Sequence, residues 1–257
     1  MSVLIDVRGV SKTFGGVVAN DNISIQVPKG SITGLIGPNG SGKTTLFNSI
    51  VGYHLIDAGS IWFHGSDISK LRVQQVARRG LLRTFQQTRI YGQMNCIENM
   101  QISISHRNIS FRSIFARQSK ENLDRAEALL EFVGLFTKRR LLAGDLSFGQ
   151  QKLLEFAMAL MNEPQALLLD EPTASLDARS EKLVMEGIGK YTESTTNLMI
   201  THQLAPLQNV SQILVMQEGQ IVQRGDYATL ASQDGLFKEM LAANLAQRES
   251  DKGNLDA

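Results

Sequence analysis

Short apolar segments rich in β-branched residues recur along the chain and alternate with stretches of helical spacing. The apolar segments predict strands, and Gly15-Gly16, Asn20-Asp21-Asn22 and Pro28-Lys29-Gly30 predict turns near the N-terminus. The expected strands are 3–8, 23–27, 31–36, 60–64, 81–85, 166–169, 197–201, 212–216 and 220–223.

The pattern changes between about 90 and 162, where apolar residues follow the period of a helix. The strands at 167–169, 197–200 and 213–216 are apolar without alternation, which is typical of strands covered by helices on both faces. We therefore predict an α/β core with a helical insertion at 90–162 and a C-terminal helix with a frayed tail at 235–257. The expected helical stripes are Leu123, Ala126, Leu129, Leu130 and Val133, and Leu153, Leu154, Ala157 and Leu160.

The composition fits a soluble globular protein of 257 residues with a formal net charge of +1, which argues against a chain that coats nucleic acid. No apolar run approaches the roughly 20 residues of a membrane-spanning helix, and we expect no secretion leader. The single cysteine, Cys96, excludes an internal disulfide and suits a reducing compartment. We therefore expect a cytosolic location for the unassembled chain.

A glycine-rich segment after strand 32–36 carries the strongest chemical signal. It matches the P-loop pattern G-x-x-x-x-G-K-[ST] and precedes a helix with Leu46, Phe47 and Ile50 on its apolar face. Backbone N–H groups of such a loop surround a phosphate, the lysine reaches the β- and γ-phosphates, and the next hydroxyl binds Mg²⁺. The competing interpretation is a plain turn. The P-loop residues are Gly37, Pro38, Asn39, Gly40, Ser41, Gly42, Lys43, Thr44 and Thr45.

Two acids close the buried strand at 166–169. Asp170 is the candidate carboxylate for the metal, and Glu171 is the candidate general base for the attacking water. The competing interpretation is a pair of acids that only ends a strand.

A second anion-binding signal, Leu-Ser-Phe-Gly-Gln at 146–150, precedes an expected helix at 151–161. Ser147, with the backbone at Gly149 and Gln150, would bind an outside phosphate or cap its own helix. Taken alone, the cap is the better interpretation.

The motifs closely resemble those of ABC transporter ATP-binding subunits over nearly the whole chain, because they occur in the same order. The segments RTFQ at 83–86 and MNCIEN at 94–99, with Phe148, resemble the branched-chain amino acid importer group, and urea importers are its near relatives. The ordered motifs are the P-loop, TFQ at 84–86, LSFGQ at 146–150, LLLDEP at 167–172, SLD at 175–177 and His202.

The resemblance implies a P-loop NTPase core with an N-terminal antiparallel β subdomain and the inserted helical subdomain, as a single ATP-binding domain over 1–257. It implies that Phe14 stacks on adenine and that Gln86 senses Mg²⁺ and the γ-phosphate. Asp177 then reports one nucleotide site to the other, and His202 contacts the γ-phosphate. Without the resemblance, Phe14 would be a core residue and His202 a structural one.

The resemblance also implies the partners. Two ATP-binding subunits, identical or paralogous, enclose two ATP molecules, and Ser147, Gly149 and Gln150 of one complete the site of the other. An integral membrane permease binds the pair at the cytoplasmic face of the inner membrane, near Gln86 to Gln93, and a solute-binding protein takes part indirectly. The expected function is ATP hydrolysis that drives import of branched-chain or other amino acids.

Several residues depart from these roles or have simpler ones. Phe148 stands where glycine is usual, so we expect a working site in which its ring points away from the phosphate. Gln203 replaces an acid after His202. We interpret His54, His64 and His106 as surface or locally bonded residues and Cys96 as a packing residue. The basic residues interpreted as solvent-exposed are Arg78, Arg79, Arg83, Lys138, Arg139 and Arg140.

Three alternatives stay open. One is a urea or amide importer subunit. Another is a soluble ABC-type ATPase acting on nucleic acid or ribosomes, which would commonly carry two nucleotide domains or a long coiled coil. The third is a P-loop kinase or GTPase, against which the missing Asn-Lys-x-Asp sequence argues.

Overall fold

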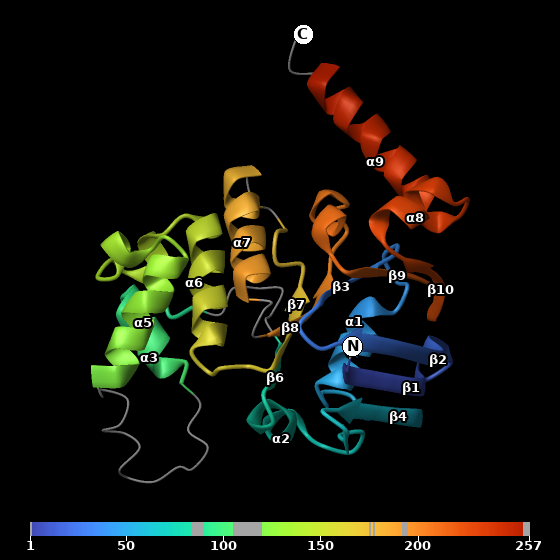
Figure 1. Ribbon diagram of the computed structural model, residues 1–257, viewed down its shortest axis with the longest axis horizontal. Helices are drawn as coiled ribbons and strands as arrows, with labels where there is room; N and C mark the ends of the chain where they lie inside the picture. Colours follow the sequence, from blue (N-terminus) through green and yellow to red (C-terminus); the bar gives the residue numbers. More distant parts are fainter. Residues whose placement is uncertain are drawn as a thin grey trace. The chain divides into compact units, whose positions relative to one another are not determined.

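The chain folds into two units, each with its own set of internal contacts. The structure is a computed structural model that describes residues 2–83, 90–104, 120–174, 176, 178–191 and 195–253 (Figure 1). The first unit comprises Met1–Lys70 and Leu198–Ala257, and the second comprises Leu71–Asn197. The predicted boundaries of a helical subdomain at 90–162 and of a C-terminal segment at 235–257 stay predictions.

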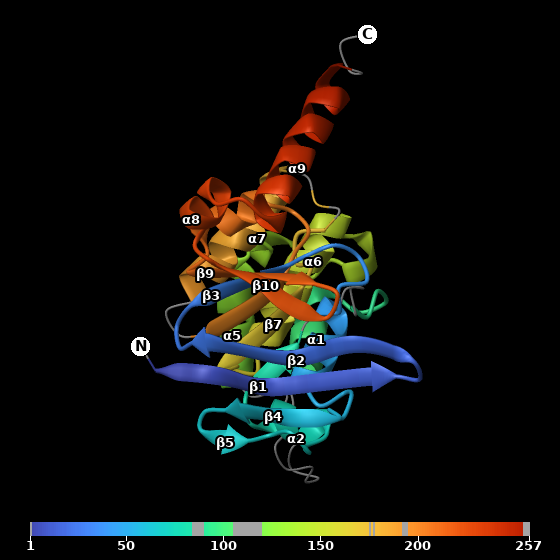
Figure 2. The ribbon, with the colours of Figure 1, turned by 90° about the vertical axis from the view of Figure 1, so that its right-hand side faces the viewer.

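The first unit contains an antiparallel sheet with the strand order β2-β1-β4-β5 (Figure 2). Along β1, Ile5 and Val7 are buried, Asp6 between them is half-buried and Arg8 is exposed. The antiparallel pairing of β1 with β2 and β4 confirms the N-terminal antiparallel part of the expected fold. The strands are β1 (Val3–Phe14), β2 (Val17–Pro28), β4 (Ala58–Phe63) and β5 (Ser66–Asp67).

The prediction of a turn at Asn20-Asp21-Asn22 is wrong, because these residues lie inside β2. The ladder pairs Asn20 with Lys12 and shifts its register on either side. Asn22 takes a φ of 48°, a left-handed conformation that asparagine tolerates. Because it pairs with β1, this segment forms an irregular strand although its sequence favours a turn.

The first unit also holds the strand that leads into the P-loop. β3 (Ile32–Ile36) is buried throughout, pairs in parallel with β9 (Gln212–Gln217), and begins one residue after the start of the predicted strand 31–36. β8 (Thr196–Ile200) lies next to β3. β10 (Gln220–Gly225) pairs with β9 in an antiparallel hairpin. The predicted strands after residue 60 agree within two residues wherever their ends are described.

Helices complete the first unit. α1 (Lys43–Ile50) buries Leu46, Phe47 and Ile50, which confirms its predicted apolar face. α9 (Leu236–Gly253) continues beyond Glu249, into the stretch expected to be frayed. The remaining helices are α8 (Tyr227–Ser232) and the 3-10 helix η3 (Ala205–Asn209).

The second unit combines two parallel strands with a group of helices. β6 (Leu81–Arg83) pairs with β7 (Ala166–Asp170), so that Arg83 is opposite Leu168. α6 starts at Phe148 and not at the predicted residue 151, because Ser147 caps it directly. The helices are α2 (Val73–Arg78), α3 (Cys96–Ile102), α5 (Lys120–Phe132), α6 (Phe148–Leu160) and α7 (Ala178–Tyr191), with 3-10 helices η1 (Phe136–Lys138) and η2 (Ala143–Asp145).

The helices of the second unit pack around a shared apolar core. α3 and α5 both contact α6, and α6 contacts α7 (Figure 1). Cys96 is fully buried, as expected of a packing residue. The predicted stripes face this core except for Leu123, which is 36 % exposed. In the part of the chain that the structure describes, we find no helix with the length and apolar character needed to cross a membrane.

Asn99 on α3 organises the loop that precedes this helix. Its side chain is fully buried. Its Nδ2 donates to the carbonyls of Tyr91, Met94 and Asn95 at 3.0, 3.2 and 3.0 Å, and its Oδ1 accepts from the Tyr91 N–H at 2.7 Å. One side chain thus contacts four main-chain groups of the loop, and the Tyr91 N–H donates to it.

We predict that Asn99→Ala lowers the free energy of unfolding by about 2 kcal/mol, because it removes a fully buried set of hydrogen bonds and takes away the acceptor of the Tyr91 N–H. Chemical denaturation measures the change. Gln101→Ala, on the same helix, keeps the four bonds and should cost no more than about 0.5 kcal/mol. Equal losses in both variants would contradict the role of Asn99.

Candidate functional site

The P-loop is pressed against neighbouring strands at two glycines. Gly37 has a φ of 151° and Gly42 one of 99°. A Cβ on Gly37 would lie 2.0 Å from the carbonyl oxygen of Met216 in β9, and a Cβ on Gly42 would lie 2.1 Å from that of Ala19 in β2. No other residue type fits either position, since real Cβ atoms do not approach an oxygen so closely.

Asn20, in β2, forms a hydrogen bond with the same loop. Its side chain is fully buried, and its Nδ2 donates to the carbonyls of Ala19 at 2.8 Å and Gly42 at 3.1 Å. Its Oδ1 has no hydrogen-bond partner among the described residues. Sequence reasoning placed Asn20 in a turn and missed this contact, because only strand pairing brings it to the loop.

Lys43 lies within the loop, as predicted, with its side chain buried. Its Nζ donates to the carbonyls of Gly37 and Pro38, each at 2.8 Å, and to Ser41 Oγ at 3.3 Å. Main-chain carbonyls of the loop thus surround the Lys43 ammonium group, and α1 begins at Lys43.

The start of α1 is suited to an anion. Gly42 is its N-cap, no side chain among the described residues caps it, and its first turn contains no acid. First-turn N–H groups and the positive end of the helix dipole attract phosphate. Pro38, Asn39, Gly40 and Thr44 are exposed beside it, and Thr45 is half-exposed.

Phe14 ends β1 with a ring that is 44 % exposed, which excludes a core role. Lys12 Nζ lies 5.4 Å from the ring centroid, and the His54 ring lies 5.1 Å away, edge to face. Asp57 accepts from Lys12 at 2.8 Å, and this bond, with those from Thr13, lowers the pKa of Asp57 to about 2. Phe14 is therefore contacted by Lys12 and His54 while much of its side chain stays exposed.

His202 also belongs to the first unit and is exposed, two residues after β8. His54 contacts Phe14 and Tyr53, so its predicted local role is confirmed. His106, Gln86 and Asp177 lie outside the described residues. The first unit thus contains the P-loop, Phe14 and His202.

The second unit holds both acids. Asp170 ends β7 and is 2 % exposed. Arg83 Nη2 lies 2.5 Å from Asp170 Oδ2. The prediction that Arg83 is solvent-exposed is wrong: its side chain is only 13 % exposed, because parallel pairing of β6 with β7 brings it to a buried carboxylate.

Glu171 has a φ of 49°, which is uncommon for a residue other than glycine. Glu171 directly follows β7 and is half-exposed, whereas Asp170 is buried, so the two adjacent acids have different surroundings. Strained backbone of this kind gathers at functional sites and costs about 1–3 kcal/mol.

Ser147 and Gln150 form a capping box on α6. Ser147 Oγ accepts from the Gln150 N–H at 3.4 Å, and Gln150 Oε1 accepts from the Ser147 N–H at 3.2 Å and from Lys138 Nζ at 3.0 Å. Here Ser147 caps its own helix, the simpler of the two interpretations. A Cβ on Gly149 would lie 2.7 Å from Ser180 Oγ, so a larger residue there would displace the Ser180 side chain. Phe148 is 48 % exposed.

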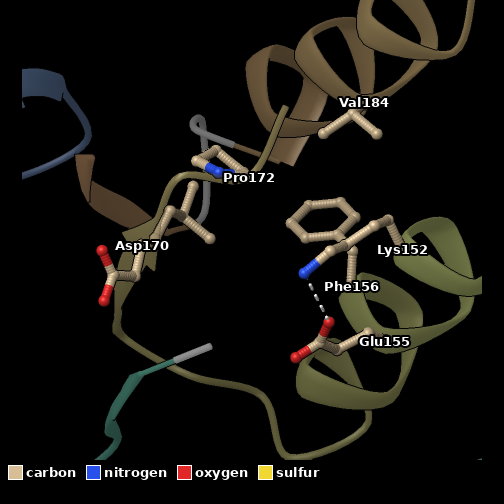
Figure 3. Close-up of a pocket in the computed structure, with 7 residues that line it drawn as sticks. Lys152, Glu155, Phe156, Asp170, Pro172 and Val184 are labelled. Atoms are coloured by element: carbon tan, nitrogen blue, oxygen red, sulfur yellow. Dashed lines mark hydrogen bonds and ion pairs between the residues drawn. The ribbon is translucent and has the colours of Figure 1, made fainter. Parts of the chain in front are cut away.

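A small cavity lies between α6 and the end of β7 (Figure 3). Lys152 and Glu155 meet there at 3.4 Å, with both side chains largely buried. The cavity offers about 20 Å³ to the centre of a water molecule, which is room for about one water. It is therefore too small for a nucleotide, and the carboxylate of Asp170 points away from it.

We predict that Gly42→Ala abolishes ATP binding, because its methyl group would collide with β2 and displace the loop. Gly40→Ala is the control: its φ is 79°, and no described atom lies within 4 Å of a Cβ built there. Gly40→Ala should bind ATP about tenfold more weakly at most, from a strain of about 1 kcal/mol. Isothermal titration calorimetry measures the ATP affinity of both variants. An unchanged ATP affinity in Gly42→Ala would contradict the role of the close contact between Gly42 and β2.

Comparisons with known proteins agree with this geometry. The family model described as "ABC transporter" matches residues 20–174. The high-affinity branched-chain amino acid transport ATP-binding protein LivG of Salmonella typhimurium is 35 % identical over 227 residues, covering 84 % of this chain and 89 % of its own. BraF of Pseudomonas aeruginosa, with the same description, is 32 % identical over the same shares.

Solved structures give the same result. A nucleotide-free ATP-binding cassette from an ABC transporter is similar with a TM-score of 0.78 and 32 % identity, covering 88 % of this chain and 92 % of its own. An ATP-binding cassette of an ABC transporter in its ADP conformation has a TM-score of 0.79 and 33 % identity over the same shares. The chain therefore belongs to the ABC transporter family as an ATP-binding subunit, a class of nucleotide-binding enzymes that hydrolyse ATP.

Proposed function

We propose that the chain drives import of branched-chain or other amino acids through a separate membrane permease by hydrolysing ATP. The observation that carries this proposal is the identity of 32–35 % to LivG and BraF, whose printed names give that transport role, over 84 % of this chain. The P-loop geometry supports the ATP part independently.

In the proposed site, the P-loop backbone from Gly37 to Thr45 binds the phosphates and Lys43 donates to the β- and γ-phosphates. The open ring of Phe14 stacks on adenine, and His202 contacts the γ-phosphate. The support is local: Lys43 already lies within the loop, Phe14 is only partly covered, and His202 is exposed.

Thr44, Asp170 and Gln86 would hold Mg²⁺. The first two fit that ion, because a hydroxyl and a carboxylate are the hard oxygen ligands it prefers, and the Thr44 side chain is exposed in the first turn of α1. When bound, Mg²⁺ would neutralise charge on the phosphate oxygens.

We propose Glu171 as the general base that takes a proton from the attacking water. Its left-handed backbone supports a role distinct from that of Asp170. Ser147, Gly149 and Gln150 would serve the nucleotide of a second ATP-binding subunit, since the N-terminus of α6 combines a serine hydroxyl with first-turn N–H groups. Asp177 would link the two sites.

The proposed permease contact is the segment Gln86 to Gln93, at the cytoplasmic face of the membrane. Of this segment the structure describes residues 90–93, where Tyr91 is 54 % exposed on the loop that Asn99 organises. An exposed aromatic residue on a fixed loop suits a protein partner. A solute-binding protein would deliver the amino acid to the permease.

The relatives favour amino acid import over the alternatives of urea import and work on nucleic acid or ribosomes. Purification of the tagged chain from its native membranes, followed by a transport assay, tests the choice. We expect an integral permease to co-purify, and uptake of labelled leucine to fail in cells lacking the chain. Recovery only with ribosomes or DNA, or loss of urea uptake with normal leucine uptake, would contradict the proposal.

We predict that Glu171→Gln keeps ATP affinity within about threefold but lowers turnover at least about a hundredfold, because it removes the base without removing a phosphate contact. Phosphate release measures turnover and calorimetry measures binding. Glu163→Gln is the matched control, since Glu163 lies in the same unit with a φ of 46° and pairs with Arg125. Undiminished turnover in Glu171→Gln would remove Glu171 from this role.

A further inference from the structure

Arg83 and Asp170 form the most buried arginine–carboxylate contact described in the second unit. The two residues end adjacent parallel strands, β6 and β7. Arg83 Nη2 lies 2.5 Å from Asp170 Oδ2, and the side chains are 13 % and 3 % exposed. A hydrogen bond between a guanidinium and a carboxylate is charge-assisted and therefore stronger than one between neutral groups.

The contact supplies Asp170 with the positive charge that a buried carboxylate needs. Removing a carboxylate from water is costly unless a cation and hydrogen bonds compensate. In Figure 3 the ammonium group of Lys152 is directed to Glu155, and the carboxylate of Asp170 points to the other side. Arg83, and not Lys152, is therefore the cation that holds Asp170 Oδ2.

A metal ion at Asp170 would take over this charge. Mg²⁺ needs near-octahedral oxygen ligands at about 2.0–2.1 Å, and an oxygen that accepts a short bond from a guanidinium is poorly available to it. The two cations therefore compete for one buried carboxylate.

We propose that Arg83 is a positioning residue that holds Asp170 in the metal-free protein and gives it up when Mg²⁺ binds with nucleotide. The inference rests on the proposed function, in which Asp170 is a metal ligand. Arg83 stands three residues before Gln86 in the sequence.

The test measures by calorimetry how tightly AMP-PNP, a non-hydrolysable ATP analogue, binds at a series of free Mg²⁺ concentrations. The midpoint is the free Mg²⁺ concentration that gives half of the metal-dependent gain in AMP-PNP affinity. Without its competitor, Mg²⁺ should bind more tightly. We expect Arg83→Met to lower this midpoint at least about tenfold, which corresponds to about 1.4 kcal/mol. Arg83→Gln, which keeps a donor but not the charge, should lower it too, and serves as the test if Arg83→Met does not fold.

Arg83→Lys restores the charge and should keep the midpoint within about threefold of the original protein. Arg125→Met is the matched control, because it breaks the arginine–carboxylate pair with Glu163 in the same unit without touching Asp170. We expect Arg125→Met to have the same Mg²⁺ midpoint as the original protein. A midpoint unchanged within twofold in both Arg83→Met and Arg83→Gln would overturn the proposal.

Thermal unfolding separates competition from a merely structural role. Without metal, Arg83→Met should melt several degrees below the original protein. Saturating Mg²⁺ and AMP-PNP should remove most of that deficit, because the metal replaces the missing charge. A deficit of equal size in both states would overturn the proposal, whereas a failure of the original protein to bind AMP-PNP at all would instead contradict the proposed function.

Discussion

The function of this protein depends on a loop that two main-chain carbonyls hold in place. Met216 in β9 and Ala19 in β2 leave no room for a side chain at Gly37 and Gly42, and Asn20 adds a buried hydrogen bond to the same loop. A loop fixed in this way has its N–H groups arranged before any ligand arrives, which lowers the entropic cost of binding a phosphate. The antiparallel sheet of the first unit thus helps to hold the loop proposed to bind phosphate.

The residues proposed to act in ATP hydrolysis come from both units. The first contains the P-loop, Phe14 and His202, and the second contains Asp170, Glu171 and the capped start of α6. In the second unit, neighbouring acids have different environments: Asp170 is buried against Arg83, and Glu171 leaves the strand through a left-handed turn. This difference supports a metal ligand beside a general base, two roles that one environment would not serve.

Residues with strong local patterns could be predicted from the sequence. The buried face of α1 and the position of β3 depend on spacing that a window of ten residues contains. The errors concern strand pairing between distant segments: Asn20 lies in β2 beside the P-loop instead of in a turn, and Arg83 meets Asp170, 87 positions away. Charge and turn propensity alone do not specify such partners. Gln86 and Asp177 lie outside the described residues, so their roles stay predictions.

The central claim is that the loop around Lys43 binds the phosphates of ATP. Calorimetric titration of the folded protein with AMP-PNP and Mg²⁺ tests it most directly, with Lys43→Ala measured in parallel. We expect saturable binding of one nucleotide per chain in the original protein, and an affinity at least about a hundredfold lower in Lys43→Ala, since a charge-assisted contact contributes about 1.5–3 kcal/mol and the loop loses its ammonium group. The absence of any heat of binding in the folded original protein, or equal affinity in the two proteins, would contradict the account.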